Sequence, residues 1–134
     1  MRMSTQRDKL IEAVAKLIEL TQHRALVWMA EEPPLSVSKR PDFGVKVVFV
    51  CKYGERNLRL YEKYIRENVE EFDEWEMRPV TRAEWRTRVV LEFIDANGNS
   101  LWVFPELIIL NDLASAVQYR VAGVKDFLAE LLAS

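Results

Sequence analysis

Few residues in this chain could carry acid–base, nucleophilic or metal chemistry. It has one histidine, His23, one cysteine, Cys51, and a dense acidic run over residues 67–76. A histidine could activate a cysteine if the fold brought the two side chains together. Cys51 lies in an alternating apolar segment, however, where burial would raise the pKa of its thiol and suppress the thiolate. We therefore interpret Cys51 as a core residue and His23 as a helix-terminal or surface residue, and we predict that the protein is not an enzyme.

The acidic run does not have the spacing of a calcium-binding loop. It contains six acidic residues but no glycine to form the tight bend that an EF-hand loop needs. The four glycines of the chain are scattered singly, so they form no phosphate-binding loop. These patterns predict neither a bound metal nor a nucleotide or other cofactor.

Length and composition are typical of one globular domain. The chain has 134 residues, of which 49% are hydrophobic and 30% charged, and a net charge of -2. We interpret it as a single domain over residues 1–134 that is neither a general polyanion binder nor a disordered chain. One cysteine fits a reducing compartment, and the N-terminal segment has charges spread among its apolar residues, unlike a signal peptide or a membrane span. We predict a cytoplasmic protein that does not enter a membrane.

Hydrophobic periodicity predicts an α+β fold. Apolar residues at helical spacing over 5–22, with Thr5 and Asp8 as a capping box, indicate an N-terminal helix. Asn111 and Gly123 mark the start and the interruption of one broken or two short C-terminal helices that pack on the sheet. Period-two alternation predicts an antiparallel meander of about five strands between these helices. The expected strands cover residues 25–30, 43–53, 58–65 and the two strands of a hairpin over 85–105.

Some of these assignments leave alternatives open. The segment over residues 58–65 could also be a helix, since Leu60, Tyr64 and Val69 lie loosely in helical phase, but alternation favours the strand. The acidic run after it is interpreted as a solvated loop, and residues 31–42, with three prolines, as another loop. In the strand over 43–53, strict alternation would place Val45 on the same face as Phe49.

A hairpin centred on residues 95–98 is the strongest local signal in the sequence. The turn sequence Asp-Ala-Asn-Gly suits a type I turn with Gly98 in the left-handed position. That turn would pair the strands so that Leu101 and Val103 face the core while Trp102 and Phe104 face outward. A shorter two-residue loop would instead turn Trp102 and Phe104 inward. We choose the first register, with its exposed apolar surface. The predicted partner-binding residues are Trp102, Phe104, Val90 and Glu92.

Basic residues concentrate on either side of the acidic run. Residues 52–66 contain five basic and two acidic residues, and residues 78–88 contain four basic and one acidic. If the two segments are neighbouring strands, their outward side chains could form the basic and aromatic surface that binds single-stranded nucleic acid. The alternative is that the acidic run neutralises them within the monomer. The predicted nucleic-acid-binding residues are Arg59, Tyr61, Lys63, Arg86 and Arg88.

In three segments, TQHRALVWM, LEFIDANGNSLWVFP and LNDLASAVQYRVAGVKDFLAELL, the sequence resembles small bacterial proteins of uncharacterised function. These share a leading helix, a strand with a tryptophan, a hairpin and a C-terminal helical segment. The resemblance covers most of the chain in outline and implies a bacterial or phage origin and an α+β layout. It transfers no functional residue.

Apolar strands without catalytic groups favour a non-catalytic protein-interaction module. Such a module would act as a homodimer or as a subunit of a larger bacterial or phage assembly. The alternative function is nucleic-acid binding through the basic and aromatic surface.

Overall fold

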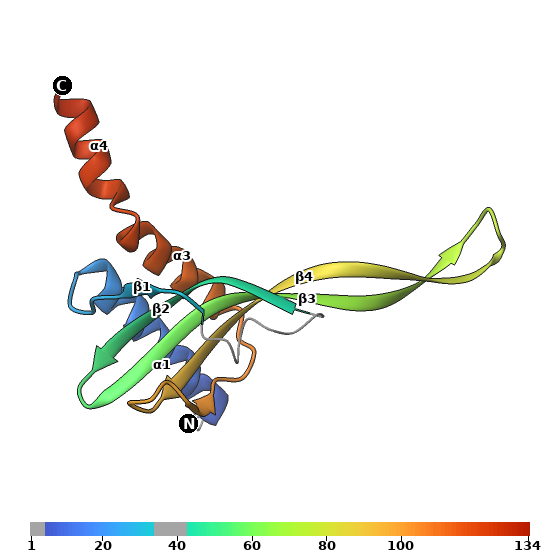
Figure 1. Cartoon of the computed structure of the whole chain (residues 1–134), viewed down its shortest axis with the longest axis horizontal. Coiled ribbons are helices and arrows are strands. Elements are labelled where there is room, and N and C mark those ends of the chain that lie inside the picture. Colours follow the sequence, from blue (N-terminus) through green and yellow to red (C-terminus); the bar gives the residue numbers. More distant parts are fainter. Residues whose placement is uncertain (1–4, 34–42) are drawn as a thin grey trace.

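Five antiparallel strands form one sheet in the computed structural model, which describes residues 5–33 and 43–134. The elements are α1 (Gln6–Gln22), β1 (Met29–Glu31), β2 (Phe43–Tyr53), β3 (Arg56–Asp73), β4 (Arg78–Ile94), β5 (Ser100–Val103), α3 (Ile109–Val121) and α4 (Val124–Ala133). The strand order β1-β2-β3-β4-β5 follows the chain, so the sheet is a simple meander (Figure 1). The predicted α+β fold is confirmed, with one helix before the sheet and two after it.

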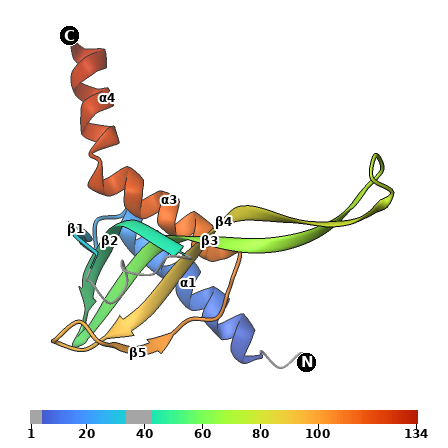
Figure 2. The same cartoon turned by 45° about the vertical axis from the view of Figure 1, so that its right-hand side comes forward.

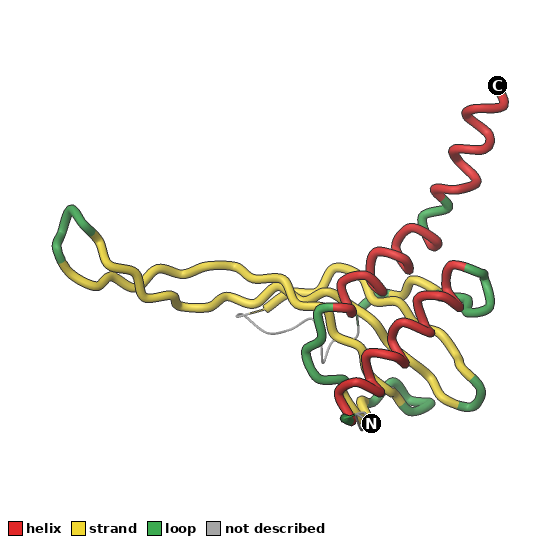
Figure 3. Tube along the Cα trace, turned by 180° about the vertical axis from the view of Figure 1, so that it is seen from behind, coloured by secondary structure: helices red, strands yellow, loops and turns green. Residues whose placement is uncertain are grey.

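Helix α1 begins with the predicted capping box. The Asp8 backbone N–H donates to the Thr5 hydroxyl at 3.1 Å, and the Thr5 N–H donates to the Asp8 carboxylate at 3.2 Å. The apolar stripe of α1 buries Val14 completely, and α3 lies beside α1 across one face of the sheet (Figure 3). The two helices and this sheet face enclose the hydrophobic core. Its buried members are Val14, Leu26, Trp28, Phe49, Cys51, Leu58, Leu60, Val89, Leu91, Phe104, Leu107, Leu110, Leu113, Ala114 and Val117.

The segment between α1 and β2 reaches the sheet later than expected. Strand β1 covers Met29–Glu31 rather than residues 25–30. The two residues predicted to share a face, Leu26 and Trp28, are nevertheless both buried. The indole N–H of Trp28 donates to the Thr21 hydroxyl at 2.9 Å, so this buried donor is satisfied. Most of the loop predicted over residues 31–42 lies outside the described residues.

A bulge in β2 interrupts the strict alternation expected there. The pairing of β2 with β3 shifts by one residue between Val45 and Val48. Phe49 and Cys51 face the core as predicted, but Val45 lies on the opposite face, because one inserted residue reverses the side to which a strand's side chains point. The prediction for Val45 is therefore wrong.

Strands β3 and β4 extend far beyond the rest of the sheet. The last described pair between β2 and β3 joins Phe43 to Ile65, whereas β3 and β4 pair for eight further rows, to Asp73 and Arg78. We name residues 66–85 the arm; it projects roughly 25–30 Å at strand spacing and is the long two-stranded ribbon of Figures 1 and 2.

Residues 58–65 form part of strand β3, so the prediction of a strand rather than a helix is confirmed. The interpretation of the acidic run as a loop is wrong for most of its length. The acidic residues as far as Asp73 belong to β3, and residues 74–77 alone form the turn. The basic residues of β4 supply the pairing partners that hold this segment extended.

The C-terminal helices separate at Gly123, as predicted. Gly123 has φ 68°, in the left-handed region that glycine adopts most readily. Helix α3 buries Leu110, Leu113, Ala114 and Val117, whereas no residue of α4 is buried, and α4 points away from the body of the molecule (Figures 1 and 2). Across the described ranges, none of the helices combines the length and apolarity needed to cross a bilayer.

Candidate functional site

The hairpin turn has the predicted geometry. The Gly98 N–H donates to the Asp95 carbonyl at 3.1 Å, and Gly98 has φ 84°, which corresponds to a type I turn followed by a left-handed glycine. The Asp95 carboxylate accepts hydrogen bonds from the N–H groups of Asn97 and Asn99, both at 2.9 Å. Hydrogen bonds from Asn99 and Asn97 lower the pKa of Asp95. The turn was therefore predicted correctly down to its left-handed residue.

The strand after the turn faces the opposite way from the prediction. Ile94 pairs with Ser100, but Phe93 pairs with Trp102, so Leu101 is an extra residue that reverses the facing of all that follows. Phe104 is buried in the core. Trp102 stacks on Phe93 with ring centroids 5.8 Å apart. Trp102 and Phe104 thus lie on the core-facing side of the sheet, contrary to prediction; Phe104 is buried, whereas Trp102 remains 40% exposed at the sheet edge.

The other two predicted partner-binding residues, Val90 and Glu92, are buried. Val90 and Glu92 lie on the sheet face opposite the helices but are only 7% and 3% exposed. The Arg59 Nε donates to the Glu92 carboxylate at 2.6 Å, and Arg59 Nη1 donates to the Gly98 carbonyl at 3.0 Å. This buried ion pair ties β3 and β4 to the hairpin turn, so Glu92 has a structural partner within the chain.

The predicted nucleic-acid-binding residues do share one sheet face. In the β3–β4 register, Lys63 lies opposite Arg88 and Tyr61 opposite Val90, on the same side as Arg59. Much of their charge is already neutralised within the chain. Beyond the buried Arg59–Glu92 pair, Arg86 contacts Glu67 at 3.2 Å and Arg88 contacts Glu106 at 3.2 Å.

Tyr61 also titrates unusually on this face. Burial, followed by the nearby Glu92 carboxylate, raises the pKa of Tyr61. The side chain therefore stays neutral over the whole physiological pH range.

The two residues weighed for catalysis have separate structural settings. His23 is the exposed C-cap of α1, and Cys51 is buried in β2, where desolvation raises the pKa of its thiol to about 12. A thiol with that pKa is almost fully protonated near neutral pH. In the described part of the chain, no three histidine, cysteine or acidic side chains gather closely enough to hold a metal ion.

The arm has two chemically different faces. On one, which we name the ion-pair face, acidic residues of β3 contact basic residues of β4: Arg82 pairs with Glu71, and Arg86 with Glu67. Five of the eight arm side chains on this face are half-buried by their neighbours. The members of the ion-pair face are Glu67, Val69, Glu71, Asp73, Arg78, Val80, Arg82 and Glu84.

The opposite side of the arm, which we name the open face, is exposed along its whole length. It continues the core-facing side of β3 and β4 beyond the helices, and all eight of its side chains are exposed. Trp85 and Phe72 are each 61% exposed. Only two of the eight residues are charged, one of each sign. The members of the open face are Arg66, Asn68, Glu70, Phe72, Pro79, Thr81, Ala83 and Trp85.

The tip of the arm adds further exposed apolar side chains. Asp73 accepts hydrogen bonds from the N–H groups of Trp75, at 2.8 Å, and Glu76, at 3.2 Å, and so organises the turn. Trp75 is 97% exposed and Met77 is 74% exposed. These two residues extend the apolar character of the arm to its end.

Helix α4 is the second exposed apolar element. Val124, Phe127, Leu128 and Leu131 have the i, i+3, i+4, i+7 spacing of one helical stripe. Phe127 is 58% exposed and Leu131 is 55% exposed. The stripe was recognised from the sequence, where it was expected to pack on the sheet.

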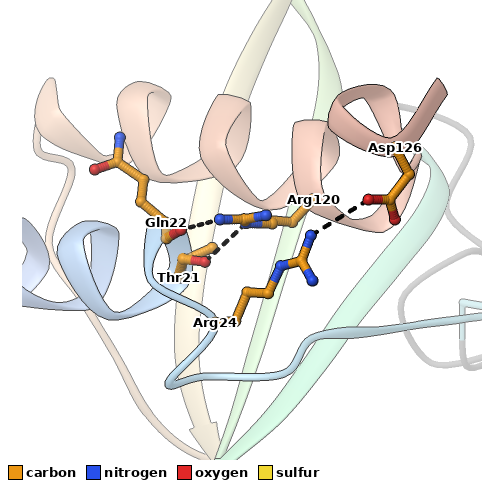
Figure 4. Close-up of polar contacts among 5 residues, drawn as sticks. All are labelled: Thr21, Gln22, Arg24, Arg120 and Asp126. Atoms are coloured by element: carbon orange, nitrogen blue, oxygen red, sulfur yellow. Dashed lines mark hydrogen bonds and ion pairs between the residues drawn. The ribbon is translucent and has the colours of Figure 1, made fainter. Parts of the chain in front are cut away.

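Polar contacts near the C-terminal end of α1 position α3 and α4 (Figure 4). Arg120 of α3 donates to the Thr21 carbonyl at 3.2 Å and to the Gln22 carbonyl. These carbonyls belong to the last turn of α1, where a cation is electrostatically favoured. Arg24 then contacts Asp126 of α4 at 3.5 Å. This exposed pair and Gly123 fix where α4 leaves the body.

Sequence reasoning missed the open face, because residues 67–76 were interpreted as a loop. The signal that could have revealed it is complementary charge: the acidic residues of 67–76 and the basic residues of 78–88 neutralise one another only if the two segments pair.

The chain matches no family model, and the searches of curated proteins and of solved structures return no significant match. The functional conclusion therefore depends on the geometry of this chain.

Proposed function

We propose that this protein is a non-catalytic protein-interaction module that acts by self-association or as a subunit of a larger assembly. The observation that carries the proposal is the pair of projecting elements, the arm and α4, which both expose apolar side chains far from the core. A cytoplasmic location and a bacterial or phage origin remain predictions from the sequence.

Both elements are of a kind that gains stability from a partner. A two-stranded ribbon without a third strand is marginally stable in water, and a ten-residue helix such as α4 is too short to be stable by itself. An apolar stripe on a helix is the usual way in which a helix docks into the groove of another protein. Exposed apolar patches of this kind mark interaction sites in soluble proteins.

The alternative, nucleic-acid binding, receives less support from the contacts. Arg59, Arg86 and Arg88 each already contact an acidic side chain, so binding a phosphate would require these ion pairs to be broken. A mobility shift that weakens steeply with salt would support this alternative.

The test compares the chain with a variant of the α4 stripe. The double substitution Phe127→Ser/Leu131→Ser removes two apolar contacts, and Lys125→Ser/Glu130→Ser is the matched control, since all four side chains are exposed. Thermal melting of the body should be the same in all three proteins, because no residue of α4 is buried.

The measurements are light scattering coupled to size-exclusion chromatography and affinity capture with the chain as bait. We expect a mass above the 15.7 kDa of one chain, or a captured partner, with binding reduced in Phe127→Ser/Leu131→Ser or in a variant of the arm and unchanged in the control. A strict monomer that captures no protein would contradict the proposal.

A further inference from the structure

We infer that the open face of the arm binds the open face of a second copy of this chain, with the two arms antiparallel. The inference rests on the proposed function and adds the partner, the surface and the register.

The arm is open on one face only. The ion-pair face is covered by its own cross-strand contacts, Arg82 with Glu71 and Arg86 with Glu67. The open face has no such cover, and in the described part of the chain neither Arg66 nor Glu70 forms an ion pair with another residue. A partner would therefore bind the open face without breaking existing contacts.

The rows of the β3–β4 ladder set the register of a symmetric pair. Five consecutive rows point to the open side, joining residues 64 to 87, 66 to 85, 68 to 83, 70 to 81 and 72 to 79. When the two arms are antiparallel, all five rows of one copy lie over the five rows of the other only if the two-fold axis passes through the middle row, which joins Asn68 to Ala83. This axis places Ala83 of one copy against Ala83 of the other at the centre. Alanine has the smallest side chain of the open face, so the two arms can approach closely there.

This register brings opposite charges together. A two-fold axis perpendicular to the arm within the contact plane sets β3 against β3 of the second copy, so residue 66 lies opposite residue 70 of the other chain. Arg66 of each copy then meets Glu70 of the other, which gives two interchain ion pairs. The two charged residues of the open face thus satisfy one another, and complementary charges of this kind select one register over others.

In this register each aromatic residue of the open face also lies opposite an uncharged side chain. Phe72 lies opposite Tyr64 of the second copy, and Trp85 lies opposite Thr81. Aromatic side chains at a pairing surface contribute much of the contact energy. Because two-stranded ribbons twist, the two arms would coil around each other as they pack.

The position of the helices excludes the parallel arrangement. Helices α1 and α3 cover the core-facing side of the sheet, which is the side that the open face continues (Figure 3). Parallel arms would press the two helical layers against each other, since sheets that pack face to face are only about 10 Å apart. Antiparallel arms place the two bodies at opposite ends. Because the register sets residue 73 of one copy opposite residue 63 of the other, the tip of each arm reaches the edge of the other copy's α3.

The first test is charge reversal at the predicted interchain pair. Arg66→Glu and Glu70→Arg each oppose like charges at two symmetric positions, so each should weaken the dimer about tenfold or more, and the double variant should recover most of the loss. Sedimentation velocity over a wide concentration range measures the dissociation constant. Arg82→Glu, on the ion-pair face of the same arm, is the control and should leave dimerisation within about threefold of the original.

The second test is site-specific cross-linking with a short bismaleimide. Ala83→Cys should give a covalent dimer, because the two introduced thiols lie at the two-fold axis. Arg82→Cys, one residue away on the ion-pair face, should not. The native Cys51 does not interfere, since it is buried and its pKa is raised to about 12.

The outcomes separate this inference from the proposed function. Dimers that resist Arg66→Glu and do not cross-link at residue 83, or a chain that stays monomeric yet captures a partner through α4, would overturn the arm pairing and leave the interaction module standing. A monomer that captures nothing would overturn both. Loss of dimerisation in both single reversals with recovery in the double variant would support the pairing.

Discussion

Removing the carboxylate of Glu92 should destabilise the protein far more than removing any exposed acidic group. The side chains of Arg59 and Glu92 are only 7% and 4% exposed. In Glu92→Ala the Arg59 guanidinium would remain buried, with the Gly98 carbonyl as its acceptor at 3.0 Å but no counter-charge. Breaking one partner of such a pair costs about 3–5 kcal/mol of unfolding free energy. For a 134-residue chain, this lowers the melting temperature by about 10–18 °C.

Thermal and urea unfolding, followed by circular dichroism, measure this change. Glu67→Ala is the matched control: it breaks the Arg86–Glu67 pair, whose side chains are 63% and 35% exposed, and should cost less than about 1 kcal/mol. Replacing both buried partners, as Arg59→Met/Glu92→Leu, should restore much of the stability because neither charge then remains buried. If Glu92→Ala and Glu67→Ala melted at the same temperature, the structural role of the buried pair would be refuted.

Two further predictions concern the core. Phe104→Ala should cost about 3–5 kcal/mol because Phe104 is buried, whereas Leu101→Ala, at 66% exposure, should cost under about 1 kcal/mol; the opposite order in urea unfolding would restore the register first predicted. The Cys51 thiol, with its pKa raised from 9.0 to about 12, should stay unreactive toward a thiol reagent at pH 8 until urea unfolds the chain. Rapid labelling of the folded protein would contradict the burial of Cys51. Because the pKa of Cys51 is raised in the folded state, the neutral thiol's contribution to the free energy of unfolding is fully present below pH 9 and is lost as the pH rises toward about 12.

Local signals in the sequence were sufficient for elements whose structure depends on nearby residues. The capping box of Thr5 and Asp8, the left-handed Gly98 and the helix break at Gly123 all follow from side-chain hydrogen bonding or glycine conformation within a few residues. The sequence therefore predicted the α+β order and the type I turn correctly.

The facing of side chains could not be predicted in the same way, because two β-bulges reverse it. One lies in β2 between Val45 and Val48, and the other in β5 at Leu101. Both segments are apolar at consecutive positions, so alternation alone does not reveal an inserted residue. The predicted outward facing of Trp102 and Phe104 was wrong for this reason, and Phe104 is a core residue.

By itself, the sequence determined the order of helices and strands, how the main turn is built and where opposite charges are available. Tertiary structure decided which strand face is covered by α1 and α3, that Glu92 is buried against Arg59, and that the acidic run continues β3 into the arm. The physical reason is that strand pairing and burial depend on residues distant in the chain. For Arg66 and Trp85, on the open face, the side chains that would cover them belong, in our inference, to a second copy.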